Sequence, residues 1–481
     1  MNIRNLSRAK RSISTTITVV IVIIIIIIAA VGGVLYFSTL PKSSTTTTTT
    51  SLSTSSSTSS TTTSTTTSPS IQIVFGATLS MGGPFQAFGQ EQNWTLFQAV
   101  NDINSYGGIP LKNGTHAMVK LVVLNDNSDP ATASSNLQTL VTSDHATVIL
   151  GELGGVQDQT AQTFATQNQI PYIGPVYISQ FKSCTSNCSS NWIFAPFENE
   201  TNEAHVFLNW FAKLSPPSNA NHTIAFFGEG DPAAAANNAA GEAYAKQLGY
   251  TVCTCSDTTF TTGSTSEMET FIGAAKAANV VAVYGLPNPP DAQLMATVAN
   301  QTGFAPKAWL LTRGTAVGAF TVPQAGGVGS NAQGFMSAFP WDPGVPYVGD
   351  LLGHNISNAQ LVSEYEAYWH IPPTLEGVYF TEVLVAANAI QNANNLTNVA
   401  IRQALLTGTF QTPMGVVNFT PGGQWVQSQQ DILLMQWQPV NGTETLQILE
   451  PSNINTTSYV YYPFVWPTSS QVKVTCSPST C

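Results

Sequence analysis

Charged residues are scarce in this chain of 481 residues. Only 15 residues are Lys or Arg and 26 are Asp or Glu, so that 9% of the chain is charged, against roughly a quarter in an average soluble protein. The surface must therefore be covered largely by Asn, Gln, Ser and Thr. The net charge of -11 argues against a nucleic-acid-binding protein, because such a protein presents a basic face.

Motifs of metal sites and of common enzymes are missing as well. The six cysteines form no CxxC pair and have no histidines close by in the sequence, so we expect neither a metal site nor a cofactor. HExxH, GxSxG and P-loop sequences do not occur. Residues 228–233 imitate a dinucleotide-binding fingerprint, but Glu229 and Asp231 would repel a pyrophosphate. We therefore expect a binding protein rather than an enzyme.

A long uncharged run stands near the start of the chain. Residues 1–12 form a basic leader, and we place a transmembrane anchor at residues 13–37, of which the last 21 carry no charge. A helix of about 20 residues spans the roughly 30 Å of a bilayer core, and the basic leader predicts a cytoplasmic N-terminus. The leader also resembles the pilin-like (class III) signal peptides of archaeal surface proteins, which would be cleaved here after Ser12. Either alternative predicts a protein held at the cell surface, with its domain outside the cytoplasm.

The chain beyond the anchor has the composition of an exported glycoprotein. Residues 38–70 are almost entirely Ser and Thr, which predicts an extended stalk, either O-glycosylated or unmodified. Eleven Asn-x-Ser/Thr sequons follow, at Asn93, Asn113, Asn187, Asn199, Asn221, Asn300, Asn355, Asn395, Asn418, Asn441 and Asn455.

The cysteines agree with an oxidising compartment. Cys184 and Cys188 bracket a short loop, as do Cys476 and Cys481, and we expect each pair to form a disulfide. Cys253 and Cys255 are too close in sequence for a comfortable bridge, so their pairing stays open.

Strands and helices are expected to alternate after the stalk. Four strands, at residues 71–77, 118–124, 147–150 and 171–174, form a first series with helices between them, and a second series begins at residue 201. Such alternation predicts parallel sheets built from βαβ units. A glycine-rich loop after the first strand, residues 78–84, would let the backbone approach a ligand closely. Two series predict two lobes.

The chain from residue 71 to 467 resembles the leucine/isoleucine/valine-binding (branched-chain amino acid) family of ABC-transporter substrate-binding proteins. The similarity is carried by residues 76–83 (GATLSMGG), 99–109 (AVNDINSYGGI) and 170–175 (IPYIGP). It implies an α/β type I periplasmic-binding-protein fold, with two Rossmann-like lobes and a central ligand cleft. We expect lobe 1 to comprise residues 71–190 and 325–411, lobe 2 residues 191–324 and 412–467, and a C-terminal tail residues 468–481.

The resemblance also implies where a ligand would bind. In the family, loops after the first, third and fourth strands of lobe 1 hold the ligand carboxylate, and a glutamate of lobe 2 holds its amino group. Here Arg313 stands at the glutamate's position, and Asp231 begins a segment that replaces a usual Tyr-Gly. The candidate ligand-binding residues are Ser80, Gly82, Gly83, Phe85, Glu152, Gly154, Gly155, Tyr177, Ser179, Asn288, Arg313 and Trp341.

The family resemblance implies an extracellular protein that captures a small organic solute and delivers it to an ABC permease and its ATPase subunits. The solute would be an amino acid, an amide or an organic acid. A surface receptor on the same fold, without a permease, is the alternative. We expect Arg313 either to bind an oxyanion bidentately or to form a solvated ion pair at the rim; in the first case a ligand with two acceptor ends would fit better than leucine.

Overall fold

The computed structural model describes residues 70–177, 192–467 and 475–476. The anchor, the stalk, Ser179, Asn187, Cys184, Cys188 and Cys481 lie outside the described residues, as does the side chain of Cys476. The described residues all belong to one unit of the chain, Thr67–Cys481. Among them, no helix is both long enough and apolar enough to cross a bilayer.

The first sheet has the strand order β2-β3-β1-β4-β5-β6. Its central strand β1 (Ser70–Leu79) lies parallel to β3 (His116–Asn125) along ten residue pairs. The remaining strands are β2 (Ile109–Pro110), β4 (Val148–Leu150), β5 (Tyr172–Ile173) and β6 (Ile193–Phe194). Helices α2 (Gln86–Ser105), α3 (Pro130–Thr142) and α4 (Gly155–Asn168) connect them. The expected βαβ alternation is confirmed.

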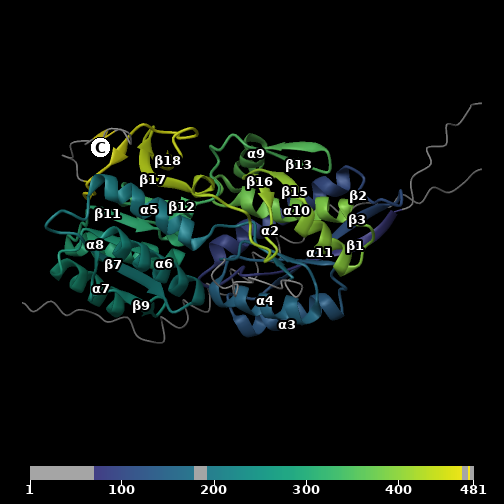
Figure 1. The fold of residues 1–481 in the computed structure, drawn as a ribbon, viewed down its shortest axis with the longest axis horizontal. Helices are drawn as coiled ribbons and strands as arrows, with labels where there is room; N and C mark the ends of the chain where they lie inside the picture. The colour runs from purple at the N-terminus through teal and green to yellow at the C-terminus, as the bar shows by residue number, and fades with distance from the viewer. Residues whose placement is uncertain (1–69, 178–191, 468–474, 477–481) are drawn as a thin grey trace, which may run out of the picture. The chain divides into compact units, whose positions relative to one another are not determined.

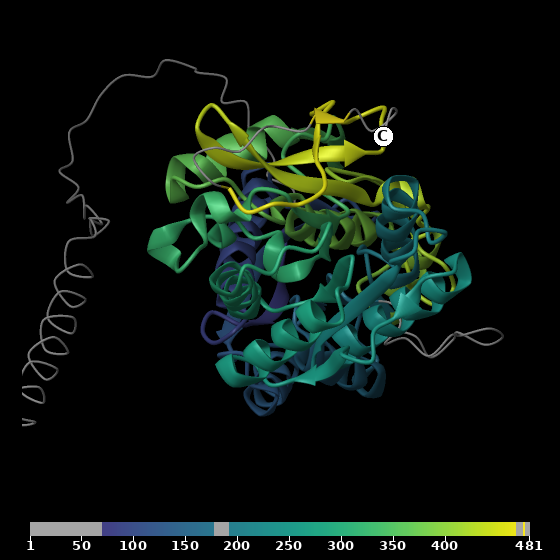
Figure 2. The same cartoon turned by 90° about the vertical axis from the view of Figure 1, so that its left-hand side faces the viewer.

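The second sheet has the order β18-β17-β12-β11-β10-β7-β8, with β9 also pairing with β7. Its strands are β7 (Thr223–Glu229), β8 (Thr251–Val252), β9 (Asp257–Phe260), β10 (Ala282–Leu286), β11 (Ala308–Leu311), β12 (Phe335–Phe339), β17 (Leu433–Val440) and β18 (Thr443–Glu450). Helices α5 (Glu200–Leu214), α6 (Pro232–Leu248), α7 (Thr265–Ala277) and α8 (Pro289–Thr302) belong to this lobe. Only β17 and β18 run antiparallel to their neighbours, and Figure 1 shows this strand pair in yellow beside β12, while Figure 2 shows the same yellow strands from the side.

The first lobe is completed by a later part of the chain. Hairpin strands β13 (Val348–Leu351) and β14 (His354–Ser357) precede α9 (Asn358–Trp369), α10 (Glu376–Asn392) and α11 (Asn398–Thr407), and strands β15 (Thr409–Thr412) and β16 (Gly415–Asn418) follow. Helix α10 packs on α2 and on β2, β13 and β15. Fourteen of its 17 residues are buried, which is the pattern of a helix enclosed by its lobe rather than lying at the surface.

Three chain crossings join the lobes, at other residues than expected. Strand β6 extends the first sheet, although we assigned residues from 191 onward to lobe 2. Strand β12, which we assigned to lobe 1, lies parallel to β11 in the second sheet. Strands β15 and β16 pack on lobe 1 beyond residue 411, and Gln424 still pairs with Ala195 there. The first crossing therefore comes after β6, the second after β12 and the third before β17. Each of these buried strands pairs with the sheet of its own lobe, and this pairing sets the boundary.

Two further expectations concern side chains of the described domain. Cys253 and Cys255 are joined by a disulfide, with an S–S distance of 2.07 Å, so the spacing that we considered too tight does carry a bridge. None of the ten sequon asparagines within the described residues is buried. N-glycosylation at these positions stays a prediction.

Candidate functional site

The loops at the carboxyl ends of β1 and β4 meet at one edge of the first sheet. The backbone N–H of Ser80 donates to the Oε2 atom of Glu152 at 2.7 Å, and the Ser80 hydroxyl donates to Asp126 at 2.8 Å. Ser80 is 1% exposed and Glu152 is 3% exposed. Adjacent parallel strands bring their carboxyl-end loops together in this way. Ser80 and Glu152 therefore both lie at the predicted edge of the sheet, and a hydrogen bond joins the two residues.

The glycine-rich loop after β1 is pinned to the loop after β3. The hydroxyl of Ser128 donates to the backbone oxygen of Gly82 at 2.7 Å and accepts from the backbone N–H of Phe85 at 3.2 Å. Gly83 has a φ of +79°, and a Cβ atom added there would lie 2.7 Å from the backbone oxygen of Asn127. Only glycine fits this close approach without strain. Gly83 therefore meets Asn127 at a distance that only glycine allows, and the expected close approach of this loop to a ligand stays a prediction.

The other predicted loop residues of lobe 1 lie nearby. Gly154 caps α4 and Gly155 begins it, so backbone N–H groups start a helix at the end of β4. The Tyr177 side chain is buried and packs edge-on against Phe197, with 5.3 Å between the ring centroids.

Arg313 lies on a 3-10 turn after β11, and it is 1% exposed. Its Nη1 atom donates to Asp231 Oδ2 and to Asn288 Oδ1, both at 2.8 Å, and its Nη2 atom donates to Asp231 Oδ1 at 3.3 Å. Burial opposes the charge on both groups, but their attraction outweighs it, so the pKa of Asp231 is lowered and that of Arg313 is raised. Arg313 therefore has an internal carboxylate partner, and neither the unpaired oxyanion-binding group nor the solvated rim pair that we considered is present.

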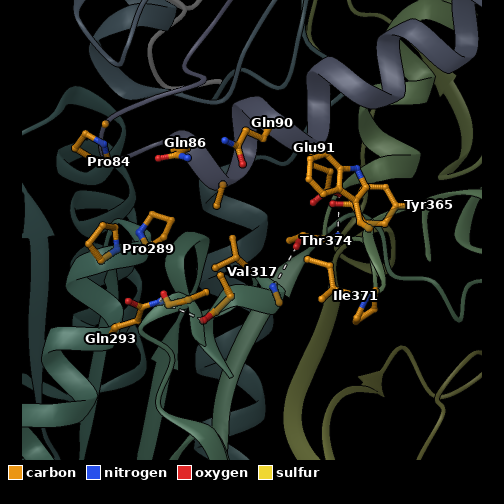
Figure 3. A pocket seen from close by; sticks show the side chains of 18 residues that line it. Pro84, Gln86, Gln90, Glu91, Pro289, Gln293, Val317, Tyr365, Ile371 and Thr374 are labelled. Atoms are coloured by element: carbon orange, nitrogen blue, oxygen red, sulfur yellow. Dashed lines mark hydrogen bonds between the residues drawn. The ribbon is translucent and has the colours of Figure 1, made fainter. Parts of the chain in front are cut away.

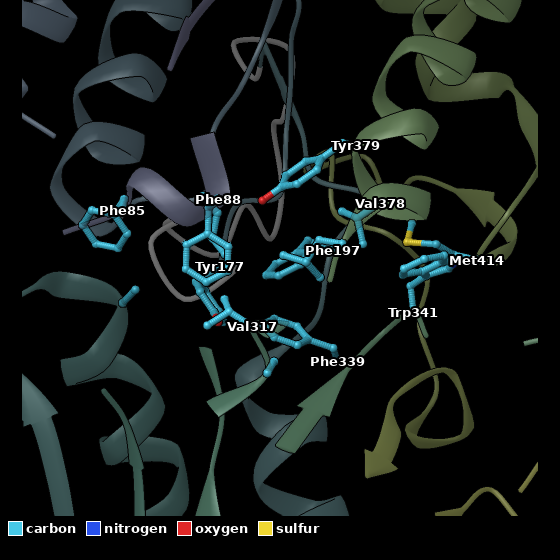
Figure 4. Packing of buried hydrophobic residues seen from close by; sticks show 14 of the residues in the cluster. Phe85, Phe88, Tyr177, Phe197, Val317, Phe339, Trp341, Val378, Tyr379 and Met414 are labelled. Carbon is cyan, nitrogen blue, oxygen red and sulfur yellow. The ribbon is translucent and has the colours of Figure 1, made fainter. Parts of the chain in front are cut away.

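Two aromatic rings of lobe 1 lie against this guanidinium of lobe 2. The Cζ atom of Arg313 is 5.7 Å from the ring centroid of Phe85 and 5.9 Å from that of Tyr177. Guanidinium groups at this range are attracted to aromatic faces. Figure 4 shows both rings in the buried layer where residues of the two lobes pack together. The two lobes are in contact at Arg313.

Asn288 and Trp341 have roles that differ from the ligand contact we expected. Asn288 accepts from Arg313, and its backbone N–H donates to Glu229 at 2.9 Å, so it orients the arginine. The indole N–H of Trp341 donates to Asn358 at 2.8 Å, and the ring is buried beside Gly377. Trp341 therefore belongs to the core at a chain crossing and is not one of the residues that line the cavity described next.

A cavity of about 390 Å³ lies between the lobes, close to this contact. Figure 3 shows side chains of α2 on one side and those of α8 and the segment around Val317 opposite. Helix α9 and residues 371–374 close a third side, and the Thr374 hydroxyl accepts from the backbone N–H of Gly318 across the lobes at 3.2 Å. The lining residues are Gly83, Pro84, Gln86, Ala87, Gln90, Glu91, Pro289, Pro290, Gln293, Val317, Gly318, Ala319, Ala325, Tyr365, Trp369, Ile371, Pro372 and Thr374.

Sequence reasoning found only Gly83 among these lining residues. Gln86 and Gln90 are four residues apart on α2, as are Tyr365 and Trp369 on α9, and residues at this spacing lie on one helix face. That spacing is the signal the sequence offered. It could not show that the two helices, far apart in the chain, line the same cavity.

Glu91 is the single charged side chain of the lining. Its Oε1 atom accepts from the backbone N–H groups of Thr374 at 2.8 Å and of Leu375 at 2.5 Å. These N–H groups stand at the start of α10, where a helix has unsatisfied donors. Burial raises the pKa of Glu91 to about 7, against these hydrogen bonds. The carboxylate therefore serves chiefly to cap α10.

Sequence reasoning also missed a cluster of buried glutamates close to Tyr177. Glu198 and Glu203 are fully buried, and Asn237 donates to Glu203 at 2.7 Å. Burial, and after it the neighbouring Glu203, raises the pKa of Glu198 well above its usual range. Glu198 stands in the first chain crossing, so local sequence gave no sign of its surroundings.

Two α/β lobes that meet around a cavity define a ligand-binding protein of the kind that closes by hinge motion. The chain belongs to the periplasmic binding protein family, whose sequence model matches residues 72–444. No curated protein matches the sequence significantly.

Solved structures show the same fold at low sequence identity. A leucine-binding protein from Thermotoga maritima is 16% identical, with a TM-score of 0.64 over 79% of this chain and 99% of that chain. A branched-chain amino acid transporter substrate-binding protein from Streptococcus pneumoniae, in complex with isoleucine, is 18% identical, with a TM-score of 0.61 over 79% and 99%. A solute-binding protein of an ABC transporter from Rhodopseudomonas palustris, in complex with 4-hydroxybenzoate, is 13% identical, with a TM-score of 0.61 over 78% and 95%.

Proposed function

We propose that this protein captures a small organic solute between its two lobes outside the cytoplasm and delivers it to an ABC permease. The observation that carries the proposal is the cavity of about 390 Å³ between the lobes, which falls in the size range of small-molecule sites. The contact of Arg313 with Phe85 and Tyr177 supports a closed state that encloses a solute. No catalytic step is part of the proposal.

The solved relatives support the transport role. They are a leucine-binding protein, a transporter substrate-binding protein in complex with isoleucine, and a solute-binding protein of an ABC transporter in complex with 4-hydroxybenzoate. A permease with its ATPase subunits is accordingly the partner that we propose here. The proposed anchor at 13–37 and stalk at 38–70 would hold the domain near that permease, at the surface of an archaeal cell and with glycans on the exposed sequons.

The binding residues that we propose differ from the sequence expectation in one main respect. Gly83 with its loop, together with Gln86 and Gln90, would contact the solute from lobe 1, and Gln293 from lobe 2. Ser80, Glu152, Gly154 and Gly155 would shape the edge of the first sheet beneath it. Arg313 would act in closure, because Asp231 already pairs with its charge.

Calorimetry on the purified full-length chain tests the binding function. The panel comprises amino acids, aromatic and aliphatic acids, amides and sugars, and we expect one class to bind with a dissociation constant below about 100 μM. Small-angle scattering should show that the domain is more compact with that ligand than without it. Absence of binding across all classes would overturn the proposal.

An uptake assay distinguishes the proposed transport function from the alternative, a surface receptor without a permease. Deletion of the gene should abolish uptake of the radiolabelled ligand, and a copy carrying the wild-type sequence should restore it. Uptake that continues unchanged in the deletion strain, with ligand binding intact in vitro, would favour the receptor.

A further inference from the structure

The chemistry of the cavity narrows the class of solute, provided that the proposed function holds. Three glutamines reach its wall: Gln86 and Gln90 from α2, and Gln293 from α8. The Gln86 and Gln90 side chains form no hydrogen bond with any residue that the structure describes. A side-chain amide offers two donor hydrogens and an acceptor oxygen. The cavity therefore presents donors and acceptors side by side, from groups without charge.

The third glutamine is partly used by its own lobe. The Nε2 atom of Gln293 donates to the backbone oxygen of Ala319 at 3.1 Å, which orients the amide and leaves its oxygen as an acceptor. Figure 3 shows Gln293 across the cavity from Gln86 and Gln90. A solute in this cavity would meet amides from both lobes.

The aromatic side of the cavity supplies a broad apolar surface and a further donor. The rings of Tyr365 and Trp369 lie one helical turn apart on α9, with centroids 6.2 Å apart and planes tilted by 32°. The indole Nε1 of Trp369 is buried and has no hydrogen-bond partner among the described residues. A buried donor without a partner is costly, and this N–H is not exposed at the cavity surface. A rotation of the Trp369 ring on binding would bring it to an acceptor on the solute.

Among the described residues, the lining of the cavity offers no positively charged side chain and a single acidic one, Glu91. Glu91 accepts two backbone N–H groups at the start of α10, and no Lys, Arg or His lines the cavity in the described part of the chain. Arg313, behind the cavity wall, is paired with Asp231. A carboxylate on the solute would lose its hydration here without gaining a cationic partner, and that loss is large. An ammonium would have to compete with the backbone N–H groups at the start of α10 for the Glu91 carboxyl group, whose pKa burial raises to about 7.

We propose that the cavity binds an uncharged solute that carries hydroxyl or amide groups on a compact skeleton. Such a solute exchanges hydrogen bonds with the glutamine amides and with the Trp369 indole N–H, and lays an apolar face on the Tyr365 and Trp369 rings. Two chemical sources share these features: a sugar of one or two rings, and a neutral amide. Amino acids and dicarboxylates do not share them.

Calorimetry with five probes at pH 6 tests the inference on the purified full-length chain. The uncharged probes are glucose, maltose and N-acetylalaninamide, and the charged probes are leucine and succinate. We expect at least one uncharged probe to bind tenfold or more tightly than both charged ones, and the sugar and amide arms identify which source is used. Tighter binding of leucine or succinate would overturn this inference and leave the proposed function standing. No binding of any probe would count against both.

Variants then locate the ligand. Gln90→Leu removes an amide from the cavity, and Trp369→Phe removes the indole N–H but keeps a ring. Each should weaken binding of the uncharged probe about three- to tenfold, the range for a hydrogen bond between neutral groups. The matched control is Gln138→Leu, on the exposed face of α3, which should leave the affinity unchanged.

Gln86→Leu serves as a second lining variant, because Gln86 is exposed and its replacement leaves the core untouched. Should Trp369→Phe fold poorly, the two glutamine variants still decide the result. Unchanged affinity in both of them would place the ligand elsewhere and overturn the inference.

Discussion

The guanidinium of Arg313 and the carboxylate of Asp231 form a buried ion pair, with Nη1 2.8 Å from Oδ2. The pair joins the turn after β11 to the start of α6, where Asp231 also accepts from the backbone N–H of Ala234. Phe85 and Tyr177 of lobe 1 rest against the same guanidinium. Arg313 therefore organises the inner face of lobe 2 and presents it to lobe 1.

Arg313→Ala should lower the free energy of unfolding by about 3–5 kcal/mol, the usual cost of removing one partner from a buried ion pair. The substitution leaves the Asp231 carboxylate and the Asn288 amide without the donor that they now share. Urea denaturation of the full-length chain at pH 7, followed by circular dichroism, measures the loss.

An exposed ion pair provides the control for this variant. Lys246 and Glu242 are 3.0 Å apart on the surface of α6, and Lys246→Ala should cost no more than about 1 kcal/mol. A stable Arg313→Ala variant that has lost only its affinity for solute would show that the guanidinium contacts the ligand, contrary to our interpretation.

Stability should fall as the pH rises through the neutral range. Burial, followed by the nearby carboxylates of Glu91, Glu364 and Glu366, raises the pKa of Glu376 from 4.5 to about 10. The folded state therefore keeps a proton that the unfolded chain has lost above pH 4.5, and stability declines with pH wherever the folded state binds more protons. At pH 4 both states are protonated, and this group then makes no difference to stability.

Glu376→Gln isolates this effect. The variant should be more stable than the wild type at pH 9 by a few kcal/mol, since one pKa unit corresponds to about 1.4 kcal/mol, and nearly equal to it at pH 4. The exposed Glu269→Gln on α7, which is not among the groups that act on Glu376, is the matched control. Parallel curves of melting temperature against pH for Glu376→Gln and wild type would contradict the prediction.

The two-lobed fold could be predicted because its signals are local. Buried β-branched runs such as β1 and glycine-rich loops after strands mark βαβ units wherever they occur. The lobe boundaries could not be predicted, because β12 and β16 each satisfy the same local pattern in either lobe. Pairing between distant strands decides the matter, as in the contact of Phe335 with Trp309.

The site was predicted less completely than the fold. Ser80, Glu152 and Gly83 follow from the rule that loops meet at the carboxyl ends of parallel strands. The partner of Arg313 did not follow, since Asp231 lies 82 residues earlier in the chain. For the same reason, neither segment's sequence showed that α2 and α9 line one cavity.

The domain should fold without the segments that precede it. Residues 67–481 form a compact unit by themselves, and the core clusters contain residues from Ile73 onward. A chain that begins at Pro69 should therefore stay soluble and unfold at the same urea midpoint as the full-length protein, within about 0.5 M. Aggregation of the shortened chain, with the full-length chain folded in detergent, would show that the front segments stabilise the domain.

The loop beside the cavity should tolerate no side chain at Gly83. Gly83 and Gly114 have nearly equal φ angles, +79° and +81°, but an added Cβ at Gly83 would lie 2.7 Å from the backbone oxygen of Asn127, whereas at Gly114 nothing lies within 4 Å. Gly114→Ala should therefore cost only the left-handed backbone strain, about 1–2 kcal/mol. Gly83→Ala should cost clearly more and should also weaken solute binding, because the loop has to move away from Asn127. Urea denaturation and calorimetry on both variants separate the steric effect from the backbone effect. Equal losses of stability in the two variants would mean that the loop shifts freely and that the close approach to Asn127 is not required.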